Sequence, residues 1–124
     1  RQEDSAVMSI VTAARQELGI TPRELKDAEI VNRLTLALAN EGAKLLQEGI
    51  AQRASDIDVV YCYGYGFPRF KGGPMHTIES MGLDIAVAQI NEFHGQLNPE
   101  HWQVAPLLAE LVDNGGQLAD YHRE

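Results

Sequence analysis

The chain contains a single cysteine, Cys62, among its 124 residues. One cysteine cannot form a disulfide within the chain, so the sequence favours a reducing compartment, and we expect a cytoplasmic location. Cys62 lies in an apolar stretch without a basic neighbour, and we predict an unreactive core thiol. No apolar run approaches the roughly 20 residues that a membrane-spanning helix needs. We therefore expect no membrane insertion.

Positive charge is also scarce. Ten Lys and Arg stand against 18 Asp and Glu, which gives a net charge of −8. Nucleic acid and anionic membrane surfaces both select a surplus of Lys and Arg, so we expect neither as a partner. The four histidines include no pair at the i, i+4 spacing of a helical metal site, so we expect no metal. No Ser lies in the strained strand-to-helix turn that presents a catalytic serine nucleophile.

Apolar residues recur at helical spacing along most of the chain, and Gly or Pro punctuates the pattern. The apolar middle of the second helix, Leu34 to Ala39, predicts the most buried segment. We expect an all-α domain with an N-terminal helix and connector (1–26) and a main helical domain (27–124). The predicted helices number five to seven and cover residues 5–18, 27–48, 55–64, 74–81, 84–94 and 106 to about 114. Short turns are predicted at 21–24 and from Asn98 to Trp102, with Trp102 pointing inward, and Asp27 is a predicted N-cap.

Residues 59–63 could form a strand or part of a helix. Their β-branched and aromatic side chains favour a strand. Ser55 followed by Asp58 has the form of a helix N-cap with an acid three residues on, and Ile57, Val60 and Tyr61 recur at helical spacing. We predict a helix that ends at Gly64.

A sharply bent segment follows, in which six of twelve residues are Gly or Pro: Gly64, Gly66, Pro68, Gly72, Gly73 and Pro74. The residues between them are aromatic, basic and apolar, which is atypical of a flexible linker. We predict an ordered bend whose Tyr65, Phe67, Phe70 and Met75 pack against the core. Gly64 or Gly66, and one of Gly72 or Gly73, should adopt positive φ. A dinucleotide-binding loop is the alternative interpretation, but it needs a third Gly and a βαβ unit.

Charged side chains on the predicted helices are interpreted as structural. Arg33 and Glu41 lie on the apolar second helix, and each should pair with another element because a buried charge requires a partner. Asp56 or Asp58 is the expected partner for Arg33. The two aspartates also fit a helix cap and first turn, where the helix dipole favours acids.

A series of motifs then occurs in one order: Asn-Arg-Leu at 32–34, Glu-Gly-Ala at 41–43, Glu-Gly-Ile at 48–50, Ala-Ser-Asp-Ile-Asp-Val-Val at 54–60, Gly-Tyr-Gly-Phe-Pro at 64–68 and Gly-Gly-Pro-Met at 72–75. Read together, they resemble the C-terminal helical domain of 3-hydroxyacyl-CoA dehydrogenases. The likeness is greatest to the last helical copy in the multifunctional fatty-acid oxidation enzymes (enoyl-CoA hydratase/3-hydroxyacyl-CoA dehydrogenase, alpha subunit). It is strong from about Asp27 to Leu83 and fainter to Tyr121.

The resemblance implies a compact fold like the C-terminal domain of 6-phosphogluconate dehydrogenase. It also implies a parent enzyme that couples enoyl-CoA hydration to NAD-dependent oxidation of 3-hydroxyacyl-CoA in fatty-acid β-oxidation. In the family, NAD and the catalytic His and Glu belong to a nucleotide-binding domain that this sequence lacks. We therefore expect no cofactor and no independent activity in this chain.

Asn32 is the residue that the resemblance singles out for chemistry. In the catalytic copy of the domain, a similar apolar-apolar-Asn-Arg-Leu stretch supplies an Asn that contacts substrate. Here the stretch is Ile30-Val31-Asn32-Arg33-Leu34, but Ala28-Glu29 replaces the Gly-Phe that precedes it there. We interpret Asn32 as a non-catalytic remnant or a polar residue of the helix surface.

Arg69 and Lys71 are the second candidate site. They project from the bend and could meet a phosphate or the adenine of coenzyme A through charge and stacking. A basic loop that contacts an acidic neighbouring domain or water is the alternative.

The resulting hypothesis is a scaffold and interface domain. Because the chain begins at Arg1 and not at Met, we expect a segment of a longer enzyme. The expected partners are other domains of the parent chain, a second copy in a weak homodimer, and a thiolase subunit. The alternative is a stand-alone helical module that works in dimerisation or as an adaptor.

Overall fold

The computed structural model describes residues 4–96 and 99–122, so the predicted cap at Asn98 lies outside the described residues. Within these ranges every regular element is a helix, and the predicted all-α class is confirmed. No helix among them is both long and apolar enough to cross a membrane. The α-helices are α1 (Ser5–Glu17), α2 (Asp27–Glu48), α3 (Ala54–Gly64), α4 (Pro74–Met81), α5 (Leu83–His94) and α6 (Pro106–Asn114), and the 3-10 helices are η1 (Arg69–Lys71) and η2 (Pro99–Trp102).

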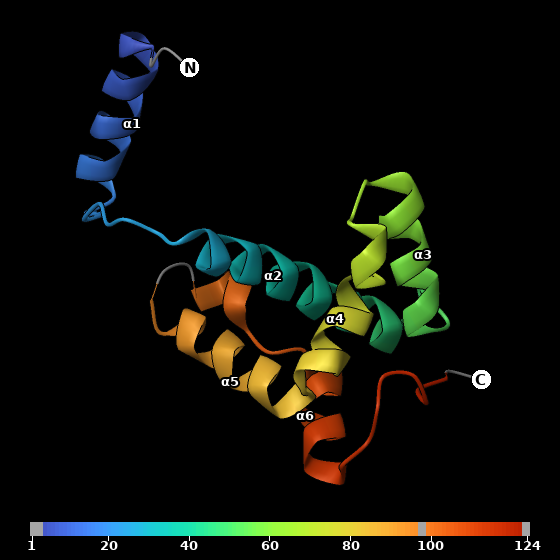
Figure 1. Ribbon diagram of the computed structural model, residues 1–124. Helices are drawn as coiled ribbons and strands as arrows, with labels where there is room; N and C mark the ends of the chain where they lie inside the picture. Colours follow the sequence, from blue (N-terminus) through green and yellow to red (C-terminus); the bar gives the residue numbers. More distant parts are fainter. Residues whose placement is uncertain (1–3, 97–98, 123–124) are drawn as a thin grey trace.

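Helix α2 runs through the middle of the main body and contacts α3, α4, α5 and α6 (Figure 1). Its inner side chains join a core that includes Leu36, Leu46, Met75, Ile90 and Leu108, all fully buried. Gly42 lets α4 approach closely, because a Cβ there would lie 2.6 Å from the Sδ atom of Met75. The predicted helix ends are also confirmed at Gly49 and Gly115, which adopt left-handed conformations.

The outer side of α2 is apolar but uncovered. Leu34, predicted within the most buried segment, is 63% exposed, and Ile30 and Val31 are 40% and 47% exposed. The prediction was wrong at Leu34 because an apolar composition does not show how many neighbouring helices are available. The neighbours here cover only the opposite face.

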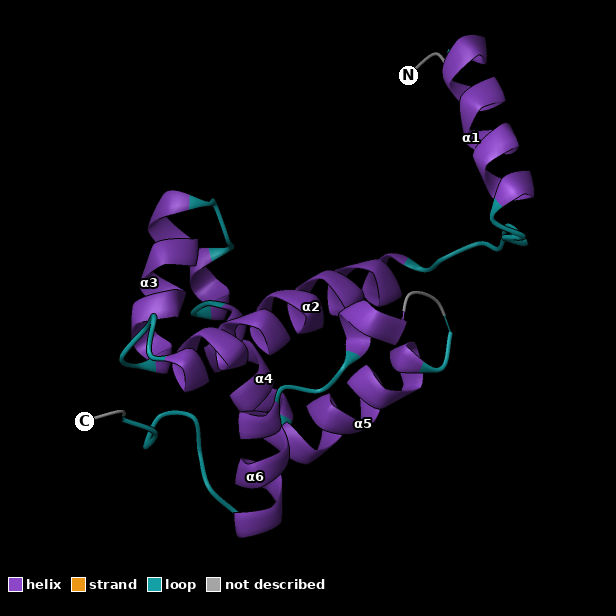
Figure 2. Cartoon of the chain, turned by 180° about the vertical axis from the view of Figure 1, so that it is seen from behind, coloured by secondary structure: helices purple, strands orange, loops and turns teal. Residues whose placement is uncertain are grey.

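Helix α1 stands apart from the main body in both views (Figures 1 and 2). None of its residues is buried. The connector to α2 forms no helical turn, so the turn predicted at 21–24 was wrong. Its Arg23 side chain instead reaches Glu29 on α2. The N-cap of α2 is Lys26 rather than Asp27, which lies in the first turn, where the helix dipole favours its charge.

Residues 59–63 lie inside α3, which confirms the helix and not the strand. The helix begins earlier than predicted, because the N-cap is Arg53 and not Ser55. The Asp56 carboxylate accepts the backbone N–H of Arg53 at 3.2 Å and lies 2.9 Å from its guanidinium. The helix therefore begins with the reciprocal Arg53–Asp56 cap and not with the predicted Ser55 cap.

The bend between α3 and α4 is ordered by its backbone more than by its aromatic rings. Gly66, Gly72 and Gly73 have φ values of 75°, 78° and 113°, so positive φ is confirmed at Gly66 and occurs at both Gly72 and Gly73, where one was predicted. Met75 is buried and Phe67 is half-buried, but Tyr65 is 77% and Phe70 89% exposed. The predicted packing was therefore wrong for these two rings, which extend beyond the helices that could cover them. Further along, Trp102 packs inward on Phe93, with ring centroids 4.9 Å apart.

Candidate functional site

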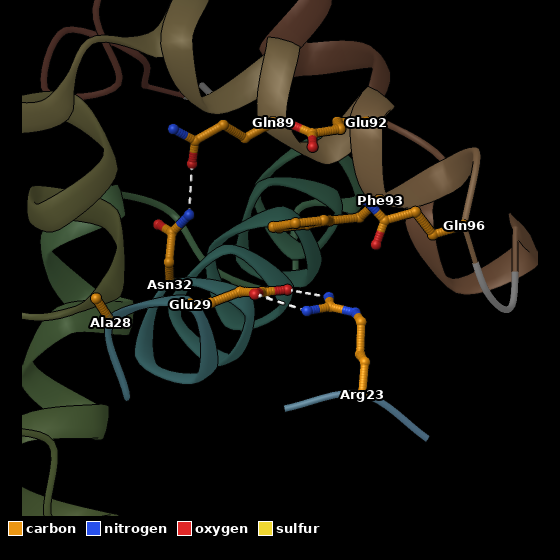
Figure 3. A pocket seen from close by; sticks show the side chains of 8 residues that line it. All are labelled: Arg23, Ala28, Glu29, Asn32, Gln89, Glu92, Phe93 and Gln96. Carbon is orange, nitrogen blue, oxygen red and sulfur yellow. Dashed lines mark hydrogen bonds and ion pairs between the residues drawn. The ribbon is translucent and has the colours of Figure 1, made fainter. Parts of the chain in front are cut away.

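An open cavity of about 720 Å³ lies between the first turns of α2 and the C-terminal half of α5. The connector closes one side of it with Arg23 (Figure 3). Most of its lining side chains are polar. They are Arg23, Ala28, Glu29, Asn32, Gln89, Glu92, Phe93 and Gln96.

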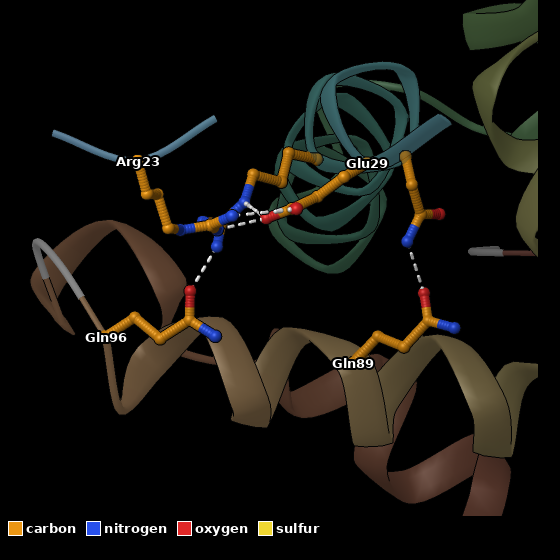
Figure 4. Close-up of polar contacts among 6 residues, drawn as sticks. Arg23, Glu29, Gln89 and Gln96 are labelled. Atoms are coloured by element: carbon orange, nitrogen blue, oxygen red, sulfur yellow. Dashed lines mark hydrogen bonds and ion pairs between the residues drawn. The ribbon is translucent and has the colours of Figure 1, made fainter. Parts of the chain in front are cut away.

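Glu29 is the centre of a polar network in this cavity (Figure 4). Its carboxylate accepts two hydrogen bonds from the Arg23 guanidinium and one from Nε of Arg33 at 3.1 Å. The hydrogen bonds from Arg23, followed by the one from Arg33, lower the pKa of Glu29 to about 2. Glu29 is therefore ionised at neutral pH and has no proton to donate.

Asn32 points from α2 toward α5, where its Nδ2 donates to Oε1 of Gln89. The Asn32 Oδ1 and the Gln89 Nε2 have no partner among the described residues, and the Asn32 oxygen is turned away from Gln89 (Figure 3). The pair thus offers one acceptor and one donor beside the cavity. Such an amide pair can hold a neutral polar group, but neither amide transfers a proton.

Arg33 was predicted to pair with Asp56 or Asp58, but it contacts neither aspartate. Besides Glu29, it donates to Oε1 of Gln96, and its Cζ lies 4.1 Å from the centroid of the Phe93 ring. The prediction was wrong because Arg33 lies near the beginning of α2 and faces α5, whereas α3 packs near the other end (Figure 1). Glu41 was also misassigned: its exposed side chain pairs with Lys44 on its own helix at 3.1 Å.

The two aspartates of α3 have different roles. Asp56 caps its own helix, as predicted. Asp58 is buried and accepts the backbone N–H groups of Met75 at 2.8 Å and of His76 at 3.0 Å. It therefore caps α4, and its assignment to the first turn of α3 alone was incomplete. Burial raises the pKa of Asp58, although these two hydrogen bonds lower it in part.

Arg69 and Lys71 do not face a common site. Arg69 lines a groove of about 410 Å³ between α3 and the start of α4, and its Cζ lies 4.5 Å from the centroid of the Tyr63 ring. Lys71 is half-buried and does not line that groove, although its carbonyl accepts the Thr77 hydroxyl at 3.3 Å. Arg69 stacks on Tyr63, not on the neighbouring Phe67 or Phe70. The binding of coenzyme A by Arg69 and Lys71 stays a prediction.

Sequence reasoning missed the partners in the main cavity. Glu29 and Arg33 have the i, i+4 spacing of a helical ion pair, so that contact was accessible from the sequence. The contribution of Arg23 was not, because a connector has no regular spacing. Gln89 and Gln96 lie about 60 residues further on, and only the packing of α5 on α2 brings them close.

Comparison with known proteins finds a matching family model and relatives that cover most of this chain. The family model described as the C-terminal domain of 3-hydroxyacyl-CoA dehydrogenase matches residues 30–119. The peroxisomal bifunctional enzyme of Danio rerio is 38% identical over 122 residues, which cover 98% of this chain and 17% of that protein.

Two further relatives show the same relation. The peroxisomal bifunctional enzyme of Homo sapiens is 37% identical over 114 residues, which cover 90% of this chain and 16% of that protein. The fatty acid oxidation complex subunit alpha of Idiomarina loihiensis is 36% identical over 105 residues, which cover 84% of this chain and 15% of that protein. The chain thus corresponds to about a sixth of the length of these relatives.

Proposed function

The chain belongs to the C-terminal domain family of 3-hydroxyacyl-CoA dehydrogenases, and from that premise we propose that it is a non-catalytic interface domain of a fatty-acid oxidation enzyme. In this proposal the longer protein oxidises 3-hydroxyacyl-CoA with NAD, and the present domain contacts and stabilises its other domains. The much greater length of the relatives supports this assignment over the alternative, a stand-alone dimerisation or adaptor module.

One observation carries the interface role. Apolar and aromatic side chains project from the outer side of α3 and from the bend, and each is more than half exposed: Val59, Val60, Tyr63, Tyr65 and Phe70. We call this set the α3–bend face. Exposed apolar patches of this kind are typical of interaction sites. We propose that another domain of the parent chain covers it.

The polar chemistry of the main cavity supports a non-catalytic role. Glu29 is held ionised by its arginine partners, and Asn32 is engaged with Gln89. The Gly64–Gly66 segment follows a helix rather than a strand, so it does not form the strand–loop–helix that binds a dinucleotide. We propose that NAD binds elsewhere in the parent enzyme. Titration calorimetry with NADH tests this point, and micromolar binding to this chain would contradict it.

The finer partners and the location are also proposals. The name of one set of relatives describes a subunit of a complex, which supports a further subunit, such as a thiolase, as a partner. The name of another set is peroxisomal, so the cytoplasmic location stays a prediction.

The interface role is tested in the full-length parent enzyme. The double variant Val60→Glu/Phe70→Glu places two charges on the α3–bend face without touching the core. We expect a lower melting temperature and a loss of 3-hydroxyacyl-CoA oxidation. The matched control is Ala88→Glu/Ala109→Glu, at exposed positions of α5 and α6. Equal behaviour of the two double variants would rule out the interface at this face.

A further inference from the structure

We propose that the α3–bend face is covered by an acidic surface of another domain of the longer chain, whose carboxylates pair with Arg69 and Lys71. The inference rests on the proposed function and deepens it, because it states the chemistry of the partner. It can also fail alone, since the face can be an interface without being selected by charge.

The bend is basic in a chain that is acidic. The net charge of the chain is −8, yet residues 59–78 include Arg69 and Lys71 and no Asp or Glu. Neither cation has an ion pair among the described residues. The two carboxylates that line the grooves beside α3 are already engaged. Asp56 is held in the cap of its own helix, and Asp58 accepts two backbone N–H groups of α4.

Two grooves flank the outer side of α3 and define what the partner must present. The groove of about 410 Å³ contains Arg69, whose Cζ lies 4.5 Å from the centroid of the Tyr63 ring. A guanidinium stacked on a ring keeps its N–H donors at the edge, where a carboxylate can bind them. The second groove, of about 560 Å³, lies between α3 and the end of α2 and is lined by side chains that include Ile50, Val60 and Tyr65. A matching surface places apolar side chains in the second groove and a carboxylate in the first.

The positions of the two cations favour a protein surface over a single small anion. Lys71 does not line the groove that contains Arg69, so the two side chains do not converge on one phosphate. An anionic membrane matches no better, because lipid-binding segments gather about four to eight cations. Exposed Tyr63, Tyr65 and Phe70 accompany the cations. Tyr, Phe and Arg are enriched in protein interfaces, so this composition fits a protein partner.

Charge also favours another domain over a second copy of this chain. A two-fold dimer through this face would place the same patch on both sides, so the basic bend of one copy would lie against that of the other. Like charges across an interface oppose association. The chain's own α1 lies beyond the start of α2, whereas α3 packs near its end (Figure 1). The Danio rerio relative offers many other surfaces, because this chain matches only 17% of its length.

Hydrogen exchange of the bend tests the proposal. Exchange of residues 65–71 is followed by mass spectrometry in the 124-residue chain and in the full-length parent enzyme. We expect exchange to be slower in the parent by at least about tenfold. Arg69→Glu/Lys71→Glu should return it to the rate of the 124-residue chain, because like charges then face the partner's carboxylates. The control Arg15→Glu/Lys26→Glu makes the same change of net charge at exposed positions of α1 and the connector, and it should leave the bend protected.

The outcomes separate this inference from the proposed function. Equally fast exchange in the 124-residue chain and in the parent would mean an uncovered bend and would overturn both. A bend that stays protected in the parent with Arg69→Glu/Lys71→Glu would overturn only the acidic partner, because the interface would then form without charge pairing. Protection that grows with the concentration of the 124-residue chain would indicate a second copy and contradict the inference.

A titration with coenzyme A tests the remaining alternative. We expect the 124-residue chain and its Arg69→Glu/Lys71→Glu variant to give the same result, with no micromolar binding in calorimetry. Micromolar binding that this variant abolishes would assign the two cations to a phosphate ligand and overturn their pairing with protein carboxylates.

Discussion

The Asp58 carboxylate of α3 accepts a hydrogen bond of 2.8 Å from the backbone N–H of Met75 in the first turn of α4. It also accepts the N–H of His76 at 3.0 Å. The residue at the N-cap of α4, Gly73, has no side chain that could serve these donors. One buried aspartate therefore caps a helix that begins 16 residues later in the chain, and it joins α3 to the first turn of α4.

Removal of this cap should destabilise the domain. Asp58→Ala leaves two N–H groups of α4 without their acceptor, and we expect a loss of about 1–3 kcal/mol in the free energy of unfolding. Asp58→Asn keeps one acceptor oxygen and should lose less. Urea unfolding followed by circular dichroism gives both values. A midpoint for Asp58→Ala equal to that of the wild type would show that solvent replaces the cap.

Gly73 should be the least tolerant glycine of the bend. Its φ is 113°, and a Cβ would lie 2.2 Å from Oδ1 of Asp58. Gly66, with φ of 75° and open space around it, carries only the backbone strain of about 1–2 kcal/mol. We expect Gly73→Ala to lower the melting temperature most and Gly66→Ala less. Gly64→Ala is the control, because that position has neither positive φ nor a close neighbour.

Asn40 should be essential for the position of the segment before α6. Its buried side chain donates to the carbonyl of Gln103 and accepts the N–H of Ala105, both at 2.8 Å. Asn40→Ala leaves the buried Ala105 N–H unpaired and opens a small cavity, so we expect a loss of about 2–3 kcal/mol. Asn91→Ala, at an exposed position of α5, is the matched control. Chemical denaturation that fails to separate the two variants would contradict this role.

The Glu29 network should make stability depend on acid. The pKa of Glu29 is lowered from 4.5 to about 2 in the folded chain. Its contribution is therefore complete above pH 4.5 and is lost as the pH falls toward 2. We expect Glu29→Gln to be less stable than the wild type at neutral pH and the difference to shrink across this window. Melting temperatures measured against pH test this, with Glu24→Gln in the connector as a control that keeps the wild-type slope.

Phe70 should contribute nothing to the stability of the isolated chain. The ring is 89% exposed, and exposed substitutions away from special features change stability by about 0.5 kcal/mol or less. We expect Phe70→Ser to unfold at the wild-type midpoint. A clear loss would mean that the ring packs against the chain in solution, as the sequence had led us to expect.

The sequence alone determined the helices of this protein. Helical spacing of apolar residues and the glycines that end each run are local signals, and they predicted α2, α4 and α6 closely and distinguished α3 from a strand. The same local reasoning predicted positive φ at Gly64 or Gly66 and at one of Gly72 or Gly73, and the structure has it at Gly66 and at both Gly72 and Gly73. The motif order from Asn32 to Met75 identified the family, because the family pattern is itself a linear property of the chain.

Only the tertiary structure decided which side chains meet. Arg33 contacts Glu29 and α5 rather than an aspartate of α3, and Asp58 caps α4 as well as lying in α3. The sequence predicted burial for Leu34, Tyr65 and Phe70, which are exposed. Periodicity assigns residues to one face of a helix, but it does not determine which neighbour covers that face. Burial and charge pairing depend on how elements far apart in the chain pack together.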